Sequence, residues 1–343
     1  MVLDTITDVP GVKVGHAEDF NAMTGVTVIL TESGAVGGID IRGTAAGTRQ
    51  VDSLSPLHVA GVVHAVTLSG GSAFGLAASG GVMKYLEEKD IGIDVFYAKV
   101  PIVPSAIIFD LGIGDSMIRP DEAMGYRAAT SAKGGSDDPD GSDGYIVGQG
   151  SVGVGTGATV GKLNGTAFAM KGGVGTASES FCPKNPTGDG AEIIVGALVV
   201  VNAFGDVIDP KSGKIMAGAR DPENPDRMLN TSTRIREGED RSMPSGQNTT
   251  LAVLATNAVL NKQGATKLAQ MAQTSLGRVI SPFHSTFDGD VVIALSLGAG
   301  EKVGINTLGM LGEIALFRAV ERAIVSADGR GIIPSYSDLN GKK

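Results

Sequence analysis

Asn248-Thr249-Thr250-Leu251-Ala252-Val253-Leu254-Ala255 joins a long polar stretch of this 343-residue chain to a strongly apolar one. Before it, residues 221–247 are charged, contain three prolines and hold almost no β-branched apolar side chain, which predicts an exposed loop. After it, residues 250–255 are apolar and short enough for a buried strand. A long loop that ends at a strand beginning with threonine is typical of a processing site in a precursor. An ordinary surface loop entering a strand has the same layout.

Other apolar runs predict a large α/β core. Short runs rich in β-branched residues and bounded by turn formers predict strands at residues 26–30, 62–68, 192–202 and 291–297. Apolar residues at helical spacing predict helices that pack on these strands, at residues 73–88, 265–279 and 307–326. Asn306 or Thr307 is a suitable N-cap for the last helix. A second exposed loop, acidic and turn-rich, is expected at residues 133–144.

Glycine is unusually frequent, with 51 of 343 residues, roughly twice the typical share of ~7%. The glycines follow no collagen-like period and gather in short clusters beside the apolar runs. Because glycine permits positive φ and a close approach of two backbones, these clusters predict tight turns around packed sheets or around a site.

Charge and cysteine content exclude several classes of protein. The net charge is −9 and no stretch concentrates Lys or Arg, which argues against binding to nucleic acid or to an anionic membrane. The single cysteine, Cys182, cannot form an internal disulfide. No apolar run is long enough to cross a bilayer, and the first residues lack the pattern of a secretory signal. We therefore expect a cytoplasmic protein that acts on neutral or cationic small molecules.

Thr249 could act as a nucleophile if the bond before it were cut. A hydroxyl needs an adjacent base at neutral pH. Cleavage after Asn248 would give Thr249 a free α-amine, whose pKa of about 7.7–8.0 suits a base at working pH. The same hydroxyl could make the cut by attacking the carbonyl of Asn248. No cofactor or metal is needed for either step.

Three further places could complete such a site. Asp288 and Asp290 lie at the start of a predicted strand, spaced so that both could face one neighbour. Lys171 opens a glycine cluster and could reach a cavity, and Asn202 interrupts an apolar strand, where its NH₂ group could donate to an oxyanion. A solvated acidic turn, a surface lysine and a core asparagine are the alternative interpretations.

Metal and nucleotide sites are not predicted. The four histidines are scattered and no zinc motif is present, so structural roles suit them better. Gly161-Lys162 is followed by Leu163, which does not fit a phosphate-binding loop, and the nearby glycine pattern at residues 153–158 is weak by itself.

Five blocks together resemble one family of peptidases over nearly the whole chain. They are Ile6-Thr7-Asp8-Val9-Pro10-Gly11, Gly70-Gly71-Ser72-Ala73-Phe74-Gly75-Leu76, Val100-Pro101-Ile102-Val103-Pro104, Ala169-Met170-Lys171-Gly172-Gly173-Val174-Gly175-Thr176-Ala177-Ser178 and Asn248-Thr249-Thr250. In this order they resemble the family of the L-aminopeptidase/D-amidase/D-esterase, the β-peptidyl aminopeptidases and the nylon-oligomer endo-hydrolase.

This resemblance implies a single catalytic domain, 1–343, with a four-layer α-β-β-α sandwich fold. It implies a precursor that cuts itself into a large fragment, 1–248, and a small fragment, 249–343. It also implies amide hydrolysis by the new amino terminus, within a homo-oligomer such as a tetramer. The match places the nucleophile at Thr249, site-lining residues at Lys171 and Asn202, and an acidic pair at Asp288 and Asp290. Tyr126 matches a supporting hydroxyl less closely.

Departures from the family pattern bear on the substrate. Threonine as nucleophile and the Asp288-Gly289-Asp290 turn are more similar to the nylon-oligomer hydrolase than to the β-peptidyl aminopeptidases. They favour small peptides or ω-amino-acid oligomers as substrates. Residues 250–258 also resemble the nucleophile strand of ornithine acetyltransferase, so an acyltransferase is an alternative. An uncut, non-enzymatic binding protein is another.

Overall fold

A computed structural model describes residues 3–135, 145–183, 190–239, 248–298 and 302–341. Parts of the two predicted loops, residues 136–144 and 240–247, lie outside the described residues. Among the described residues, none of the helices is both long and apolar enough to span a membrane.

Ten strands form one hydrogen-bonded sheet, in the order β11-β12-β15-β17-β2-β4-β7-β3, with β1 paired to β2 and β8 to β1. Most neighbours are antiparallel, whereas β15–β17 and β4–β7 are parallel. The strands are β1 Lys13–Asp19, β2 Thr24–Ile41, β3 Thr48–Arg49, β4 Val63–Ser69, β7 Ser105–Ile107, β8 Lys133–Gly134, β11 Gly173–Phe181, β12 Ile193–Asn202, β15 Thr249–Thr256 and β17 Val291–Ser296. The five predicted strands all lie within this sheet.

Strand β2 connects the two halves of the sheet. Its first part pairs with β1 and β4, and its last part, from Val36 to Ile41, pairs with β17. The register shifts between Leu30 and Ala35, beside Gly34 at a φ of 86°. The prediction of a short strand at residues 26–30 was wrong in length, because the second half of β2 alternates small and polar residues and lacks an apolar run.

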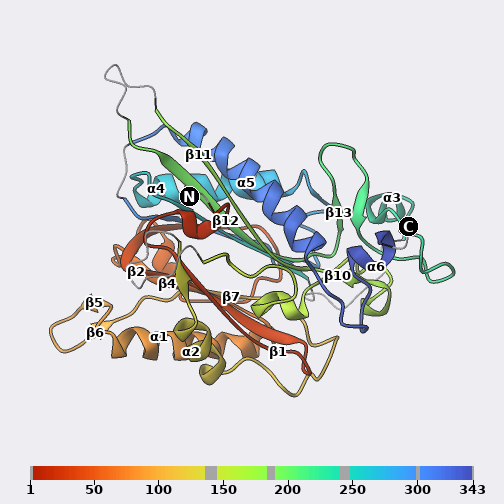
Figure 1. Cartoon of the computed structure of the whole chain (residues 1–343), viewed down its shortest axis with the longest axis horizontal. Coiled ribbons are helices and arrows are strands. Elements are labelled where there is room, and N and C mark those ends of the chain that lie inside the picture. The colour runs from red at the N-terminus through yellow and green to blue at the C-terminus, as the bar shows by residue number, and fades with distance from the viewer. Residues whose placement is uncertain (1–2, 136–144, 184–189, 240–247, 299–301, 342–343) are drawn as a thin grey trace.

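Three hydrophobic cores define four layers, which confirms the predicted α-β-β-α sandwich (Figure 1). Helices α4 (Lys262–Leu276) and α5 (Ile305–Val325) cover one outer face, and α1 (Ala78–Glu88) and α2 (Glu122–Thr130) cover the other. Along β15, side chains alternate between cores. Ala252 and Leu254 pack toward α4 and α5, whereas Leu251, Val253 and Ala255 pack between the two halves of the sheet.

Helix boundaries depart from the predictions where caps decide them. The first predicted helix begins as a 3-10 helix, η3, and becomes α-helical only at Ala78. Helix α4 begins three residues early, because the side chain of Asn261 caps it by accepting from Gly264 N at 2.8 Å. The N-cap of α5 is Gly304, so the prediction of Asn306 or Thr307 was wrong.

The sequence predicted that the whole polar stretch before Thr249 is a loop, and this prediction was wrong in part. It contains helix α3, which Asn230 caps by accepting from Thr233 N at 2.9 Å. Shorter elements complete the fold: η1 Ile6–Asp8, η2 Val51–Leu54, η3 Ser72–Ala77, η4 Gly153–Gly157, η5 Thr166–Phe168, β5 Ile93–Asp94, β6 Lys99–Val100, β9 Thr159–Val160, β10 Met170–Lys171, β13 Asp206–Ile208, β14 Ile215–Ala217, β16 Ile280–Ser281, α3 Thr231–Arg236 and α6 Tyr336–Asn340.

Glycine allows the helices to lie directly on the sheet. A Cβ at Gly175 of β11 would meet the carbonyl oxygen of Ala319 in α5 at 1.9 Å, and one at Gly38 of β2 would meet Thr266 N in α4 at 2.1 Å. Any side chain at either position would push the helix off the sheet. The predicted close approach of backbones is confirmed at these two contacts.

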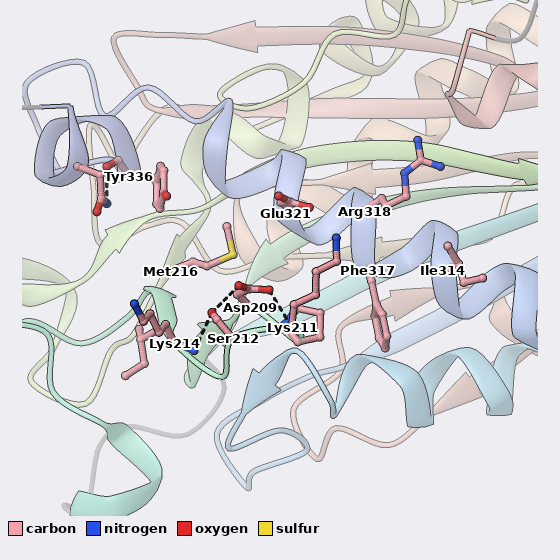
Figure 2. A pocket seen from close by; sticks show the side chains of 13 residues that line it. Asp209, Lys211, Ser212, Lys214, Met216, Ile314, Phe317, Arg318, Glu321 and Tyr336 are labelled. Carbon is pink, nitrogen blue, oxygen red and sulfur yellow. Dashed lines mark hydrogen bonds between the residues drawn. The ribbon is translucent and has the colours of Figure 1, made fainter.

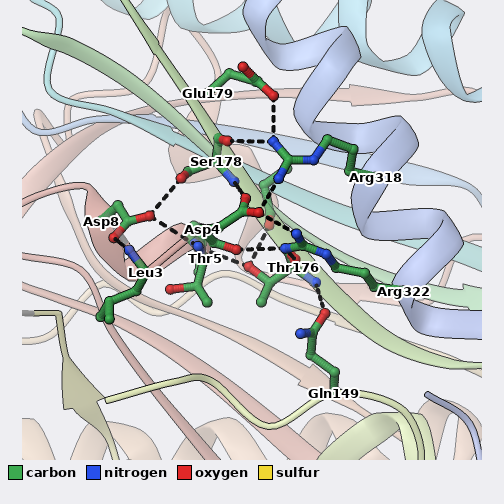
Figure 3. A network of polar contacts seen from close by, with 12 residues as sticks. Leu3, Asp4, Thr5, Asp8, Gln149, Thr176, Ser178, Glu179, Arg318 and Arg322 are labelled. Carbon is green, nitrogen blue, oxygen red and sulfur yellow. Dashed lines mark hydrogen bonds and ion pairs between the residues drawn. The ribbon is translucent and has the colours of Figure 1, made fainter. Parts of the chain in front are cut away.

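Asp4 fastens the amino-terminal segment to β11 and α5 (Figure 3). Its carboxylate accepts from Arg318, Arg322 and Ser178 N, and Arg322 also donates to Asp4 O at 2.7 Å. Partial burial raises the pKa of Asp4, but the hydrogen bonds from Arg322 and Ser178 N and both arginine charges outweigh it and lower that pKa below its ordinary value. The ionised form therefore stabilises the folded chain.

We expect Asp4→Asn to lower the free energy of unfolding by about 1.5–3 kcal/mol, the usual contribution of a hydrogen bond to a charged group. Because the folded pKa is depressed, the wild-type advantage is present above the unfolded pKa and is lost as the pH falls through the folded pKa. Urea unfolding at neutral and acidic pH measures both effects. Asp90→Asn, which breaks an exposed pair with Lys99, is the control and should change little. Equal losses in both variants would contradict the prediction.

Candidate active site

Thr249 begins strand β15, between the end of β12 and the start of β17. It pairs with Asn202, the last residue of β12, because β12 and β15 are antiparallel. On the other side β17 runs parallel to β15, so the residues before β17, Asp288 and Asp290, lie beside the start of β15. All four side chains are buried. The sheet thus gathers four of the predicted residues around one point.

The peptide bond between Asn248 and Thr249 is held at its carbonyl. The Thr249 hydroxyl donates to Asn248 O, and Gly289 N donates to the same oxygen at 2.9 Å. Asn248 Nδ2 also donates to Phe287 O at 3.3 Å. The hydroxyl therefore lies next to the carbonyl that it would have to attack, and a backbone N–H already points at the oxygen where negative charge would develop.

The two aspartates hold different partners, contrary to the expectation that both face one neighbour. Asp290 Oδ1 accepts from Thr250 N at 2.7 Å, whereas Asp288 Oδ1 accepts from Phe204 N at 3.0 Å. Burial raises the pKa of Asp288, and the nearby charge of Asp290 raises it further. Hydrogen bonds from Ser285 and Phe204 N act in the opposite direction. Asp290 thus holds the backbone just after Thr249, and Asp288 holds the backbone just after Asn202, the residue that pairs with Thr249.

Asn202 has partners for both ends of its amide, as a buried amide needs. Its Oδ1 accepts from Lys162 Nζ at 2.9 Å and from Thr159 N at 3.0 Å, and its Nδ2 donates to Phe109 O at 3.2 Å. Lys162 Nζ also donates to Asn202 O at 2.9 Å. Burial lowers the pKa of Lys162 to about 7, while the charges of Asp288 and Asp110 act to raise it.

Lys162 is thus a site residue that the sequence did not reveal. Its local sequence, Gly161-Lys162-Leu163, resembles a phosphate-binding loop only weakly and does not indicate a contact with Asn202. Its position beside Asn202 depends on contacts between distant segments, because Lys162 N donates to Phe204 O at 3.0 Å and Gly161 N to Gly205 O at 3.1 Å.

Lys171 is buried, and its ammonium faces backbone. Its Nζ donates to the carbonyl oxygens of Gly155, Ala158 and Gly172 at 2.7, 2.8 and 2.8 Å. Burial lowers the pKa of Lys171 to about 7 as well. Three hydrogen bonds match the three donors of a lysine ammonium. This side chain therefore holds residues 155–158, which lead to Thr159 beside Asn202, and does not reach Thr249. The alternative of a surface lysine is wrong too.

Tyr126 lies apart from the other predicted residues. It belongs to helix α2 in an outer layer, where its hydroxyl donates to Glu88 at 2.6 Å and its ring packs edge-on against Tyr85 at 6.0 Å. The hydrogen bond to Glu88 raises the pKa of Tyr126. This hydroxyl supports the contact between α1 and α2, and the structure does not bring it to Thr249.

A small crevice leads to the partners of Asn202. Its lining comprises Phe109, Asp110, Gly112, Ile113, Gly157, Thr159, Lys162 and Thr166. Burial raises the pKa of Asp110 to about 6, although Thr24 Oγ1 and Gly71 N donate to its carboxylate at 2.6 and 2.7 Å. A buried acid and a buried amine therefore border the crevice, whose open volume of about 10 Å³ has room for no more than a water molecule.

A larger hollow, of about 490 Å³, lies between the β13–β14 turn and helices α5 and α6 (Figure 2). Met216, Phe317 and Tyr336 form part of its apolar lining, and Lys211 and Glu321 extend over it. No candidate site residue lines this hollow. Over the described part of the chain, no three His, Cys, Asp or Glu side chains come together as metal ligands would.

Comparisons with known proteins identify a family for this chain. The family model of "Peptidase family S58" matches residues 4–329. An uncharacterized aminopeptidase of Mycobacterium leprae is 38% identical, over 98% of this chain and 94% of that protein. A 6-aminohexanoate-oligomer endohydrolase of Kocuria sp. is 28% identical, over 84% of this chain and 74% of that protein.

A solved structure shares the fold. The L-aminopeptidase D-Ala-esterase/amidase of Ochrobactrum anthropi, described as a variant of the Ntn hydrolase fold, superposes with a TM-score of 0.69 at 19% sequence identity. The superposition covers 95% of this chain and 87% of that one.

Proposed function

Because this chain belongs to peptidase family S58 and is a hydrolase of amide bonds, we propose that it is activated by cutting itself between Asn248 and Thr249. The observation that carries the proposal is the contact between the Thr249 hydroxyl and Asn248 O at the start of β15. Cleavage would leave fragments 1–248 and 249–343 within one folded domain. The freed amino-terminal Thr249 would then be the nucleophile.

The cut can be written with the residues at hand. Thr249 Oγ1 attacks the carbonyl carbon of Asn248, and Gly289 N stabilises the oxyanion. The C–N bond breaks as nitrogen takes the proton that the hydroxyl loses, which leaves an ester on Thr249. Water hydrolyses this ester, giving Asn248 a carboxylate and Thr249 a free hydroxyl and α-amine. Movement of Asn248 away from Thr249 would open the site to substrate.

Turnover would repeat this chemistry on a substrate amide. The α-amine takes the proton from the Thr249 hydroxyl, directly or through one water, and the oxygen attacks the substrate carbonyl. The C–N bond breaks, the amine product leaves with that proton, and water hydrolyses the acyl-threonine. Asn202 would donate to the oxyanion with the Nδ2 hydrogen that Phe109 O does not take, and Lys162 holds the other end of that amide. Asp290 holds the backbone just after the nucleophile, and Asp288 holds the backbone that follows Asn202.

Small peptides and oligomers of ω- or β-amino acids are the proposed substrates, since the relatives are named as aminopeptidases and as 6-aminohexanoate-oligomer endohydrolases. We also expect a cytoplasmic homo-oligomer. A screen against amino-acid p-nitroanilides, β-peptides and aminohexanoate oligomers identifies the preferred substrate.

Amino-terminal sequencing of the purified protein tests the proposal. Denaturing electrophoresis should separate two fragments, and the smaller should begin Thr-Thr-Leu-Ala-Val. An intact chain with full amidase activity, or a fragment that begins at another residue, would refute it. Product analysis with and without ornithine checks the acyltransferase alternative, in which an amine accepts the acyl group in place of water.

A further inference from the structure

His284 directs two donors at one oxygen of Asp290. It lies in the turn between β16 and β17. Its backbone N and its ring Nδ1 contact Asp290 Oδ2 at 3.2 and 3.0 Å. Since a carboxylate can only accept, Nδ1 carries the proton of this hydrogen bond. The other oxygen, Oδ1, accepts from Thr250 N. A chain of hydrogen bonds therefore runs from His284 through Asp290 to the residue after Thr249.

The backbone and ring of His284 are both constrained. Its φ of 57° lies in the left-handed region, which is costly for a residue with a side chain, although histidine adopts it more readily than most. The ring packs against Phe283 with centroids 4.0 Å apart, and the side chain is 24% exposed. Strained backbone of this kind persists where the surroundings hold it in place. Here that conformation serves the contact with Asp290.

Asp290 depends on these donors because its side chain is completely buried. Without the ring N–H, Oδ2 would keep only one donor, His284 N. A buried carboxylate short of donors is unfavourable, so it would rotate toward other donors. This rotation would loosen Oδ1 from Thr250 N and release the backbone beside Thr249.

We propose that His284 is a positioning residue that fixes Thr249 through Asp290. The inference rests on the proposed function, in which Thr249 is the nucleophile. A nucleophile displaced by about 1 Å can lose a hundredfold in rate while substrate binding is preserved. The role of His284 should therefore show in the rate of self-cleavage and in kcat, and hardly in KM.

Two substitutions separate positioning from simple packing. His284→Gly removes the donor and relieves the positive φ, so it should not fail to fold through backbone strain. His284→Asn keeps an N–H near the place of Nδ1 and tolerates the left-handed conformation. The matched control is His58→Asn, because His58 lies 3.6 Å from the exposed carboxylate of Asp52 and away from Thr249.

The rate at which the small fragment forms, and kcat and KM on an amino-acid p-nitroanilide, are the measurements. His284→Gly should slow fragment formation and lower kcat by about ten- to a hundredfold, with KM within about twofold of wild type. Added imidazole should restore several-fold of the lost rate. His284→Asn should stay within about threefold of wild type, and His58→Asn should be unchanged.

Three results would overturn the inference. They are wild-type rates in His284→Gly, a rise in KM with kcat unchanged, or equal losses of kcat in His284→Gly and His284→Asn with no response to imidazole. Amino-terminal sequencing of the wild-type protein tests the proposed function separately. That function fails if the small fragment does not begin at Thr249. The kcat comparison then still reports whether His284 positions Asp290 in the active enzyme.

Discussion

Thr249→Ala protein is expected to remain a single chain of 343 residues and to lose amidase activity by a factor of about 10⁴ to 10⁶, as enzymes do when a nucleophile is removed. The Thr249 hydroxyl is the group that contacts Asn248 O, and alanine offers no atom to attack that carbonyl. Denaturing electrophoresis and release of p-nitroaniline measure the two effects. Circular dichroism should match wild type, because only a local hydrogen bond is lost.

Two control variants make this result specific. Thr249→Ser keeps the hydroxyl, so it should still be cut and should retain activity. Thr250→Val alters the neighbouring side chain while keeping the N–H that donates to Asp290, and should be processed at close to the wild-type rate. Cleavage of Thr249→Ala at the same bond would show that another residue attacks. Loss of processing in all three variants would indicate general damage to the strand.

Local sequence was sufficient for those site residues that lie at strand ends. The apolar runs of β12, β15 and β17 indicate where each strand stops, so the amino-acid sequence alone places Asn202, Thr249 and Asp288 at ends of strands. Their meeting depends on strand order, parallel for β15–β17 and antiparallel for β12–β15. The family resemblance implied that these residues share a site, but neither it nor the residue pattern gave the strand order.

The two lysines show where local sequence fails. Lys162 and Lys171 both stand beside glycines, and nothing nearby distinguishes them. Their difference arises from pairing across the chain: β9 and β10 align Thr159 with Lys171, while the contact of residue 162 with Phe204 turns the other lysine toward Asn202. Local sequence does not reveal the surroundings of Tyr126 either, because its contact with Glu88 depends on how α1 and α2 pack together.

Lys162→Met should therefore lower activity, whereas Lys171→Met should lower stability. Lys162→Met removes a donor that holds Oδ1 of Asn202, which frees the amide to turn its NH₂ group away. We expect self-cleavage and kcat to fall by about a hundred- to a thousandfold, the usual cost of a lost oxyanion donor. Lys171→Met leaves three backbone carbonyls without their ammonium. It should lower the free energy of unfolding, because each buried carbonyl left unsatisfied costs about 1–3 kcal/mol, with kcat of the folded fraction little changed.

The pH dependence of stability gives an independent check on both side chains. Burial lowers each pKa from 10.5 to about 7, so between these values the unfolded chain binds more protons than the folded one. Stability must then rise with pH from about 7 toward 10.5. Urea unfolding at about pH 7 and pH 9 should show this rise in wild type, and a smaller rise in each methionine variant. If Lys171→Met instead abolished turnover at unchanged stability, and Lys162→Met only weakened the fold, the two roles assigned from the structure would have to be exchanged.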